Sequence, residues 1–377
     1  VLLLTASNSG YLEMLTNWEC FATRLELDWM VMAMNKELQT HLGERSFLAT
    51  GQEWEKAEAF NSPVGFKVIS CNKLRSVLDV MRETNLDIVF SDADNVFKSD
   101  PFLPSLSLGS MIRSGKYEYI YGRKIEPGGQ KIQNLNPEVY HQEPIKANTG
   151  FYYVAGGRKQ NIVQRIFEVS VEWCDRRPSL DDQENFWDGL VATRNKKSTE
   201  KGYVACFRHC DSDKCQGVNE SMVLNYCDMS PWEYILGCFS TESALKEPRM
   251  VSYHATHVFG WPAKKGKLQN VKLWANCDES EITGVKVTTS TPSTSTSTPL
   301  PTSTNVVSST GAESAGETTQ LVPGENGDSL TVRLRRHAGL YKDKSYAPEL
   351  KNVLLLTASN SGYLEMLTNW ECFATRL

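Results

Sequence analysis

Short apolar strands alternate with amphipathic helices along residues 1–285, and this alternation limits the folds open to the chain more than any other feature. Buried strands are predicted at residues 1–5, 29–34, 67–70, 87–91, 117–121, 149–154 and 249–253. Helical spacing of apolar residues predicts helices at residues 11–25, 72–85, 161–173 and 183–190. Strands that alternate with helices pair in parallel. We therefore expect an α/β fold with a mostly parallel central sheet flanked by helices, and ligands at the carboxyl ends of its strands.

The composition changes sharply near residue 285. Every residue from Thr288 to Thr304 except Leu300 is Ser, Thr or Pro. Such a stretch cannot bury a core, so residues 286–327 are predicted to form a disordered, mucin-like Ser/Thr/Pro-rich linker that carries O-linked glycans. The folded domain is expected to occupy residues 1–285.

A repeat follows the linker. Residues 353–377, inside the segment 328–377, are identical to residues 1–25. We interpret them as the truncated start of a second copy of the whole unit, so the parent protein is expected to be a tandem array. Because the chain opens on Val1 rather than Met, the natural N-terminus is expected to be missing.

Charge and hydropathy exclude two classes of partner. A net charge of −5 and a pI of about 5.8 give no basic footprint for nucleic acid or for an anionic membrane. No apolar run approaches the roughly 18–20 residues of a membrane span, so no membrane anchor is expected in this fragment.

The ten cysteines are unevenly placed, and five of them crowd into one segment: Cys206, Cys210, Cys215, Cys227 and Cys238. Disulfides are the favoured explanation, with a metal knuckle near Cys206, His209 and Cys210 or unpaired thiols as alternatives. The only N-glycosylation sequon begins at Asn219, in the same segment. Disulfides imply an oxidising compartment, so we expect a protein of the secretory pathway, in the Golgi lumen or secreted.

The strongest chemical signal is a strand that ends in two carboxylates. The strand predicted at residues 87–91 leads directly into Asp92 and Asp94. Carboxylates two residues apart at a strand terminus can point the same way and bind a hard divalent cation. Such a cation would bridge them to a nucleotide pyrophosphate, which carboxylates alone would repel. A solvated loop is the alternative for Asp-x-Asp, but the position after a buried strand favours the metal site.

This motif lies in a series of segments that resembles glycosyltransferase family 77, the nucleotide-diphospho-sugar transferases. The matching segments, in the family's order, are residues 5–12 with Asn17 and Trp18, residues 91–101 (SDADNVFKSDP), residues 148–153 (NTGFYY), Asp182-Gln183 with Phe186, and His254-Ala255 with Gly260 and Lys264. They span about residues 1–270. The resemblance implies a GT-A fold, a Rossmann-like sheet with Asp-x-Asp at its centre, and a retaining transferase.

The resemblance implies a partner for each group of residues on the donor side. Thr5, Asn8 and Tyr11 would hold the base, with Tyr11 stacking on uracil; a helix start capped by Ser7 or Asn8 is the alternative. Lys73 would meet the donor phosphate, as would Arg75, although a solvated helix face is the alternative. Asn148 and Thr149 would bond sugar hydroxyls or simply begin a polar strand.

The remaining residues would serve catalysis and metal binding. Asp181, Asp182 and Gln183 would orient the sugar or stabilise positive charge at the anomeric carbon; an acidic helix cap is the alternative. His254 is the expected third metal ligand, with His257 as its competitor, because His257-x-x-Gly260 matches the motif of the related glycogenin-like family. An imidazole beside two carboxylates suits Mn²⁺ somewhat better than Mg²⁺. Lys264 or Lys267 would bind the pyrophosphate.

Together these features predict a metal-dependent retaining glycosyltransferase that moves a sugar from a nucleoside-diphosphate donor, UDP in the first place, to a glycan or glycoprotein acceptor. One alternative is a non-catalytic carbohydrate-binding domain of a tandem-repeat, mucin-like extracellular protein, which the intact set of acidic and histidine residues disfavours. A disulfide-rich adhesion protein is disfavoured because only Cys20 and Cys71 precede residue 170. No P-loop or G-x-G-x-x-G motif competes.

Overall fold

A computed structural model of the 377-residue chain describes ten segments. They are residues 1–56, 65–123, 131–135, 147–156, 162–195, 206–210, 212, 215–275, 277 and 282. The predicted linker at 286–327 and the segment 328–377 with its repeat lie outside the described residues. Within the described part, no helix is both long and apolar enough to cross a bilayer.

The centre of the molecule is a sheet of eight described strands. Their spatial order is β3 (Ser46–Leu48), β2 (Trp29–Ala33), β1 (Leu2–Ser7), β4 (Ile88–Ser91), β7 (Ala147–Val154), β6 (Tyr119–Arg123), β9 (Val223–Asp228) and β8 (Cys206–His209). β7 runs antiparallel to both of its neighbours, and the other neighbouring pairs are parallel. The predicted α/β fold with a mostly parallel sheet is therefore confirmed.

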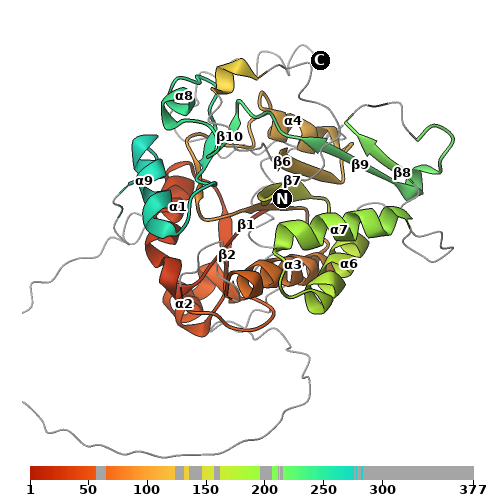
Figure 1. Ribbon diagram of the computed structural model, residues 1–377, viewed down its shortest axis with the longest axis horizontal. Coiled ribbons are helices and arrows are strands. Elements are labelled where there is room, and N and C mark those ends of the chain that lie inside the picture. The colour runs from red at the N-terminus through yellow and green to blue at the C-terminus, as the bar shows by residue number, and fades with distance from the viewer. Residues whose placement is uncertain are drawn as a thin grey trace, which may run out of the picture.

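Helices cover both faces of this sheet, because successive strand residues point to opposite sides. Leu3 and Val89 belong to the core that packs against α1 (Leu12–Arg24) and α2 (Lys36–Leu42). Leu4 and Phe90 belong to the core on the other face. That face is covered by α3 (Gly65–Thr84), α6 (Ile162–Arg176) and α7 (Asp182–Asn195), which lie together in Figure 1.

A smaller sheet stands beside the carboxyl end of β4. It has the order β10 (Tyr234–Leu236), β11 (Ser252–His254) and β5 (Asn95–Phe97). The chain passes from β4 to β5 through Asp92 and Asp94, so the two sheets meet at the Asp-x-Asp motif. The remaining described helices are α4 (Ser107–Ser114), α8 (Thr241–Leu245), α9 (Trp261–Asn270) and the 3₁₀ turns η1 (Ser9–Tyr11), η2 (Gly43–Arg45), η3 (Ile132–Asn134) and η5 (Glu220–Met222).

The strand predicted at residues 67–70 is wrong. These residues belong to α3, whose buried side continues from Ser70 through Leu74 and Val77 to Met81. The apolar pair Val68 and Ile69 is part of this helix, and the third strand along the chain is instead the three-residue β3, which lies at the edge of the sheet. The other predicted strands and helices are confirmed, although α3 begins at Gly65 rather than residue 72 and α7 continues to Asn195 rather than residue 190.

Four disulfides join the described cysteines, which confirms that explanation of the cluster. Cys206–Cys215 and Cys210–Cys227 lie within the crowded segment. Cys71–Cys174 joins α3 to α6, and Cys20–Cys277 joins α1 to the chain after α9. Among the described cysteines Cys238 keeps a free thiol, and burial raises its pKa to about 11.

Candidate active site

A cavity of about 580 Å³ opens at the carboxyl ends of β1 and β4, where the two sheets meet. Its walls come from the loop after β1, the first turns of α3, the Asp-x-Asp loop, the start of β7, the start of α7 and the segment from the end of β11 to α9. Parallel strands deliver their carboxyl ends to one edge of the sheet, and this is where such folds place their ligands.

Backbone hydrogen bonds fix the Asp-x-Asp loop from two sides. The Asp92 amide donates to the Gly150 carbonyl of β7 over 2.7 Å, and the Ala255 amide donates to the Asp94 carbonyl over 2.9 Å. The Asn95 amide closes the turn on the Asp92 carbonyl. Neither aspartate therefore depends on its side chain for its position.

Each aspartate offers one oxygen to a lysine and the other to His254. Asp92 Oδ1 lies 3.0 Å from Lys73 Nζ, and Asp92 Oδ2 lies 3.8 Å from His254 Nε2. Asp94 Oδ2 lies 2.8 Å from Lys264 Nζ, and Asp94 Oδ1 lies 3.3 Å from His254 Nε2. The two carboxylate oxygens that do not pair with a lysine, Asp92 Oδ2 and Asp94 Oδ1, therefore face the same imidazole nitrogen.

This donor set fits a divalent cation. Oxygens of Asp92 and Asp94 and a nitrogen of His254 all lie within 4.8 Å of one another. Gly150 lies beside them, and the missing side chain leaves the space that Asp92 and the His254 ring occupy. Two carboxylates and one imidazole are ligands that Mn²⁺ accepts.

Charges around the cavity would not hold a nucleotide diphosphate unaided. Among its described lining residues, the carboxylates of Asp92, Asp94, Asp181 and Asp182 face only two ammonium groups, those of Lys73 and Lys264. A bound cation would remove this excess negative charge.

Burial and the neighbouring charges set the ionisation of Asp94, which is 6% exposed. Burial alone would raise the pKa of Asp94, but Lys264 and His254 outweigh it and hold that pKa well below its usual range. The carboxylate is therefore ionised at neutral pH and available as a ligand.

Lys73 connects the metal-binding candidates to the catalytic candidates. Its Nζ lies 2.9 Å from Asp182 Oδ2 as well as 3.0 Å from Asp92 Oδ1. Burial alone would lower the pKa of Lys73, but the carboxylates of Asp182 and Asp92 outweigh burial and raise it. A solvated helix face therefore does not describe Lys73, although Arg75 on the same helix pairs with Asp175 away from the cavity.

The start of α7 supplies the predicted Asp-Asp-Gln segment, and its members do different things. Asp181 Oδ1 accepts a hydrogen bond from the Glu184 amide over 2.8 Å, which caps the helix. Asp182 is the first helical residue and accepts from the Thr149 hydroxyl over 2.9 Å. Asp181, Asp182 and Gln183 all line the cavity, as do Asn148 and Thr149.

The predicted base-binding residues divide between the cavity and the core. Asn8 and Tyr11 line the cavity, whereas Thr5 is fully buried in β1 and does not. Asn8 Oδ1 also accepts from the Tyr11 amide over 3.1 Å, so the capping alternative holds for Asn8. Capping by Asn8 leaves Tyr11 on the cavity wall.

The two candidate histidines and the two candidate lysines all come from the segment that runs from the end of β11 into α9. The members of each pair lie in different places. His254 is the last residue of β11, and His257 lies on the cavity wall with a φ of 58°. Lys264 reaches Asp94, whereas Lys267 Nζ donates to the carbonyls of Gly237 and Thr256 and lies outside the lining. Gly260 is the N-cap of α9 and is not a lining residue.

Some lining residues carried no sequence signal. Phe66, Ile69 and Ser70 enter the wall because α3 begins earlier than predicted, and Phe259 is 64% exposed at the cavity. A correct start for α3 would have placed the first three, since they precede Lys73 at helical spacing.

No family model and no curated protein matches this chain. Several solved structures of glycosyltransferases are similar to it. The galactosyltransferase LgtC, in complex with donor and acceptor sugar analogs, is similar at 10% identity over 74% of this chain and 98% of that chain, with a TM-score of 0.38. A glycosyltransferase involved in glycosylation of the PBCV-1 major capsid is similar at 8% identity over 72% and 98%, with a TM-score of 0.36. GlyE of Streptococcus pneumoniae TIGR4 is similar at 11% identity over 52% of this chain and 43% of that chain, with a TM-score of 0.30.

Proposed function

We propose that the chain is a metal-dependent, retaining glycosyltransferase of the family 77 type. It would move a sugar from a nucleoside-diphosphate donor, UDP in the first place, to a glycan or glycoprotein acceptor. The observation that carries this proposal is the convergence of Asp92 Oδ2, Asp94 Oδ1 and His254 Nε2 beside Lys264 at one cavity. These side chains suit a cation and a diphosphate together, and a simple carbohydrate-binding surface needs neither.

In this proposal each group of cavity residues has one task. Asp92, Asp94 and His254 would hold Mn²⁺ or Mg²⁺, which would neutralise the diphosphate as the glycosidic bond breaks. Lys264 would bind the leaving diphosphate as a point charge. Tyr11 and Asn8 would hold the nucleoside, and Asn148 and Thr149 the sugar hydroxyls.

Asp182 is the carboxylate best placed to act on the sugar. It is 4% exposed, and Lys73 and Thr149 hold its Oδ2 from two directions. A carboxylate held in this way at the cavity would stabilise positive charge at the anomeric carbon. Lys73 would act as a positioning residue, because its ammonium group pairs with both carboxylates and so fixes Asp182 relative to Asp92.

The compartment forms part of the proposal. Four disulfides among the described residues suit a protein that folds in the secretory pathway, and we propose the Golgi lumen or the extracellular space. Asn219, the sequon asparagine, is exposed at the start of η5 and is accessible there to glycosylation.

The experiment that tests the function is a screen of the full chain against UDP-, GDP- and CMP-sugars, with release of the nucleotide as the readout. We expect hydrolysis of one donor that requires Mn²⁺ and stops when a chelator is added. If glycans bind but no donor is hydrolysed with any divalent cation, the non-catalytic carbohydrate-binding alternative replaces the enzyme.

The two histidines make separable predictions. His254→Ala should weaken Mn²⁺ binding at least about tenfold, because its Nε2 faces both aspartates and is a ligand in our proposal. His257→Ala is the matched control and should weaken it less. Manganese affinity can be followed by electron paramagnetic resonance of the free ion. A larger loss in His257→Ala would transfer the ligand role to that residue.

The domain boundary makes another prediction. Asn17 bonds the Leu273 carbonyl and the Ala275 amide, and Cys277 is joined to Cys20 one helical turn away. Ile282 is still buried in the core. Mild proteolysis should therefore trim the chain to a stable product ending near residue 285 that still binds the nucleotide, as mass spectrometry and a binding assay can establish. If removal of residues 286–377 unfolds the protein, this boundary is wrong.

A further inference from the structure

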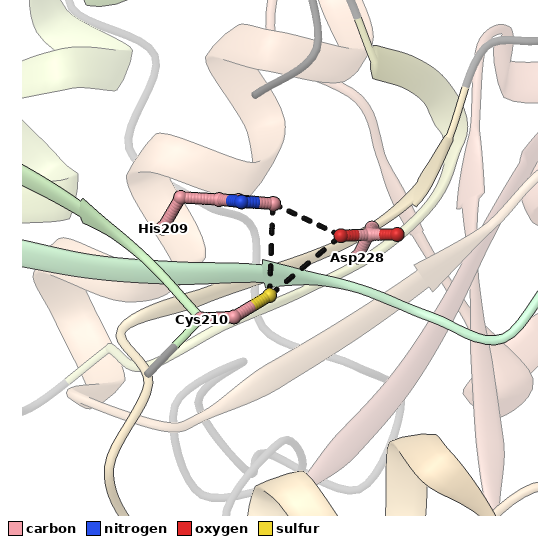
Figure 2. Close-up of side chains that lie close together, drawn as sticks. All are labelled: His209, Cys210 and Asp228. Atoms are coloured by element: carbon pink, nitrogen blue, oxygen red, sulfur yellow. Dashed lines mark hydrogen bonds and ion pairs between the residues drawn. The ribbon is translucent and has the colours of Figure 1, made fainter. Parts of the chain in front are cut away.

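A second cluster of ligand-type side chains lies at the carboxyl ends of β8 and β9, apart from the cavity. His209 is the last residue of β8 and pairs with Tyr226 of β9, so Cys210 comes opposite Cys227 and close to Asp228. Figure 2 shows the His209, Cys210 and Asp228 side chains pointing toward one another. Cys210 and Cys227 form a disulfide. His209, Cys210, Cys227 and Asp228 are all absent from the lining of the cavity.

The spacing of the cluster is that of a metal centre. Cys210 Sγ lies 3.6 Å from His209 Nε2 and 3.7 Å from Asp228 Oδ1. In a tetrahedral zinc site with Zn–S near 2.3 Å and Zn–N or Zn–O near 2.1 Å, neighbouring ligand atoms are roughly 3.4–3.7 Å apart. His209 Nε2 and Asp228 Oδ1 are closer, at 2.9 Å, and need to separate by about half an ångström.

The burial of this cluster favours the binding of a cation. His209 is 5% exposed and Asp228 is 3% exposed. The Tyr226 ring lies 5.1 Å from the imidazole, and the Tyr121 hydroxyl lies 3.2 Å from His209 Nε2. A carboxylate in such a place is costly unless an opposite charge or hydrogen bonds compensate it, and a divalent cation does so most completely.

We propose that His209, Asp228, Cys210 and Cys227 form a Zn²⁺ site that the Cys210–Cys227 disulfide closes. A dithiol reductant supplies two electrons: its own sulfurs join in a disulfide as the Cys210–Cys227 bond breaks into two thiols. Zn²⁺ then binds the two thiolates, the His209 nitrogen and an Asp228 oxygen, and the two thiol protons leave to solvent. The same sulfur atoms serve both forms, so the disulfide and the metal exclude each other.

Either form ties the ends of β8 and β9 together. In an oxidising compartment the disulfide performs this task, and before oxidation, or under reducing conditions, zinc performs it. The site therefore responds to redox state with a small local adjustment, because His209 and Asp228 already face each other in the disulfide form and need to separate only slightly.

The test uses the full chain, reduced with dithiothreitol and freed of it under anaerobic conditions, and Co²⁺ as the spectroscopic probe for Zn²⁺. Thiolate ligation gives an intense charge-transfer band in the near ultraviolet, which carboxylate and imidazole ligands at the cavity do not give. We expect this band in the reduced protein, its absence in the oxidised protein, and its loss on addition of Zn²⁺. His209→Ala and Cys210→Ser should lose it. The double variant C206S/C215S, which removes the neighbouring disulfide, is the matched control and should keep it.

A second measurement guards against binding by an unfolded reduced chain. Alkylation of the zinc-loaded protein, mapped by mass spectrometry, should spare Cys210 and Cys227 and modify Cys206 and Cys215. Equal protection of all four cysteines, no protection of any, or a cobalt band that survives His209→Ala would each overturn the proposal.

Discussion

Asp94→Asn is expected to lower metal-dependent turnover about a thousandfold and to abolish the effect of Mn²⁺ on nucleotide binding. Asp94 Oδ1 faces His254 Nε2 at 3.3 Å, and its carboxylate is held ionised by Lys264 and His254. A catalytic cation contributes several kcal/mol to the transition state, and roughly 4 kcal/mol corresponds to about a thousandfold in rate. Steady-state kinetics and nucleotide binding by calorimetry, each with and without Mn²⁺, measure the two effects.

A second variant separates loss of the ligand from loss of the fold. Asp94 is buried, and its removal leaves Lys264 without its carboxylate partner at 2.8 Å. The double variant D94N/K264M removes both charges and should recover thermal stability without recovering turnover. Unchanged manganese-dependent nucleotide affinity in a folded Asp94→Asn protein would remove Asp94 from the metal site.

The sequence predicted those parts of the fold that depend on local patterns. The strands β1, β2 and β4 each begin with a run of apolar residues and are buried on both faces, and such runs are recognisable without knowledge of the neighbouring strand. The strand predicted at residues 67–70 was wrong because a short apolar run fits a strand or a buried helix equally well. β3 was not predicted because three residues are too few to show an alternation of apolar and polar side chains.

The candidate site was predictable only in part, for a similar reason. Asp92 and Asp94 were found because their position at a strand end is itself a local pattern. His254 faces them because β11 pairs antiparallel with β5, with His254 opposite Asn95, and no local pattern encodes that pairing. The double ion pair of Lys73 depends in the same way on how α3 and α7 approach β4. The disulfide Cys20–Cys277 spans 257 residues, and neither of its cysteines belongs to the cluster that suggested disulfides.

Gly150 shows most directly that this site depends on the packing of strands that are far apart in the sequence. It lies on β7 beside β4, and its carbonyl accepts the Asp92 amide. A Cβ built at residue 150 would overlap the His254 ring and Asp92 Oδ2, and would lie 2.9 Å from Asn148 Oδ1. The backbone conformation itself needs no glycine, since its φ is not positive, so the requirement is one of space alone.

Gly150→Ala is therefore expected to lower turnover at least about a hundredfold, because a displacement of about 1 Å at reacting groups can cost that much. Overpacking of a dense region should also destabilise the fold by roughly 1–3 kcal/mol. Gly122→Ala on the neighbouring strand β6 is the matched control, since a Cβ there meets only the Phe151 carbonyl at an ordinary 3.5 Å. Turnover, Mn²⁺ affinity and thermal unfolding of the two variants give the comparison. If Gly150→Ala keeps the Mn²⁺ affinity and turnover of Gly122→Ala, then His254 and Asp92 do not need the positions they hold here, and the three-ligand metal site is wrong.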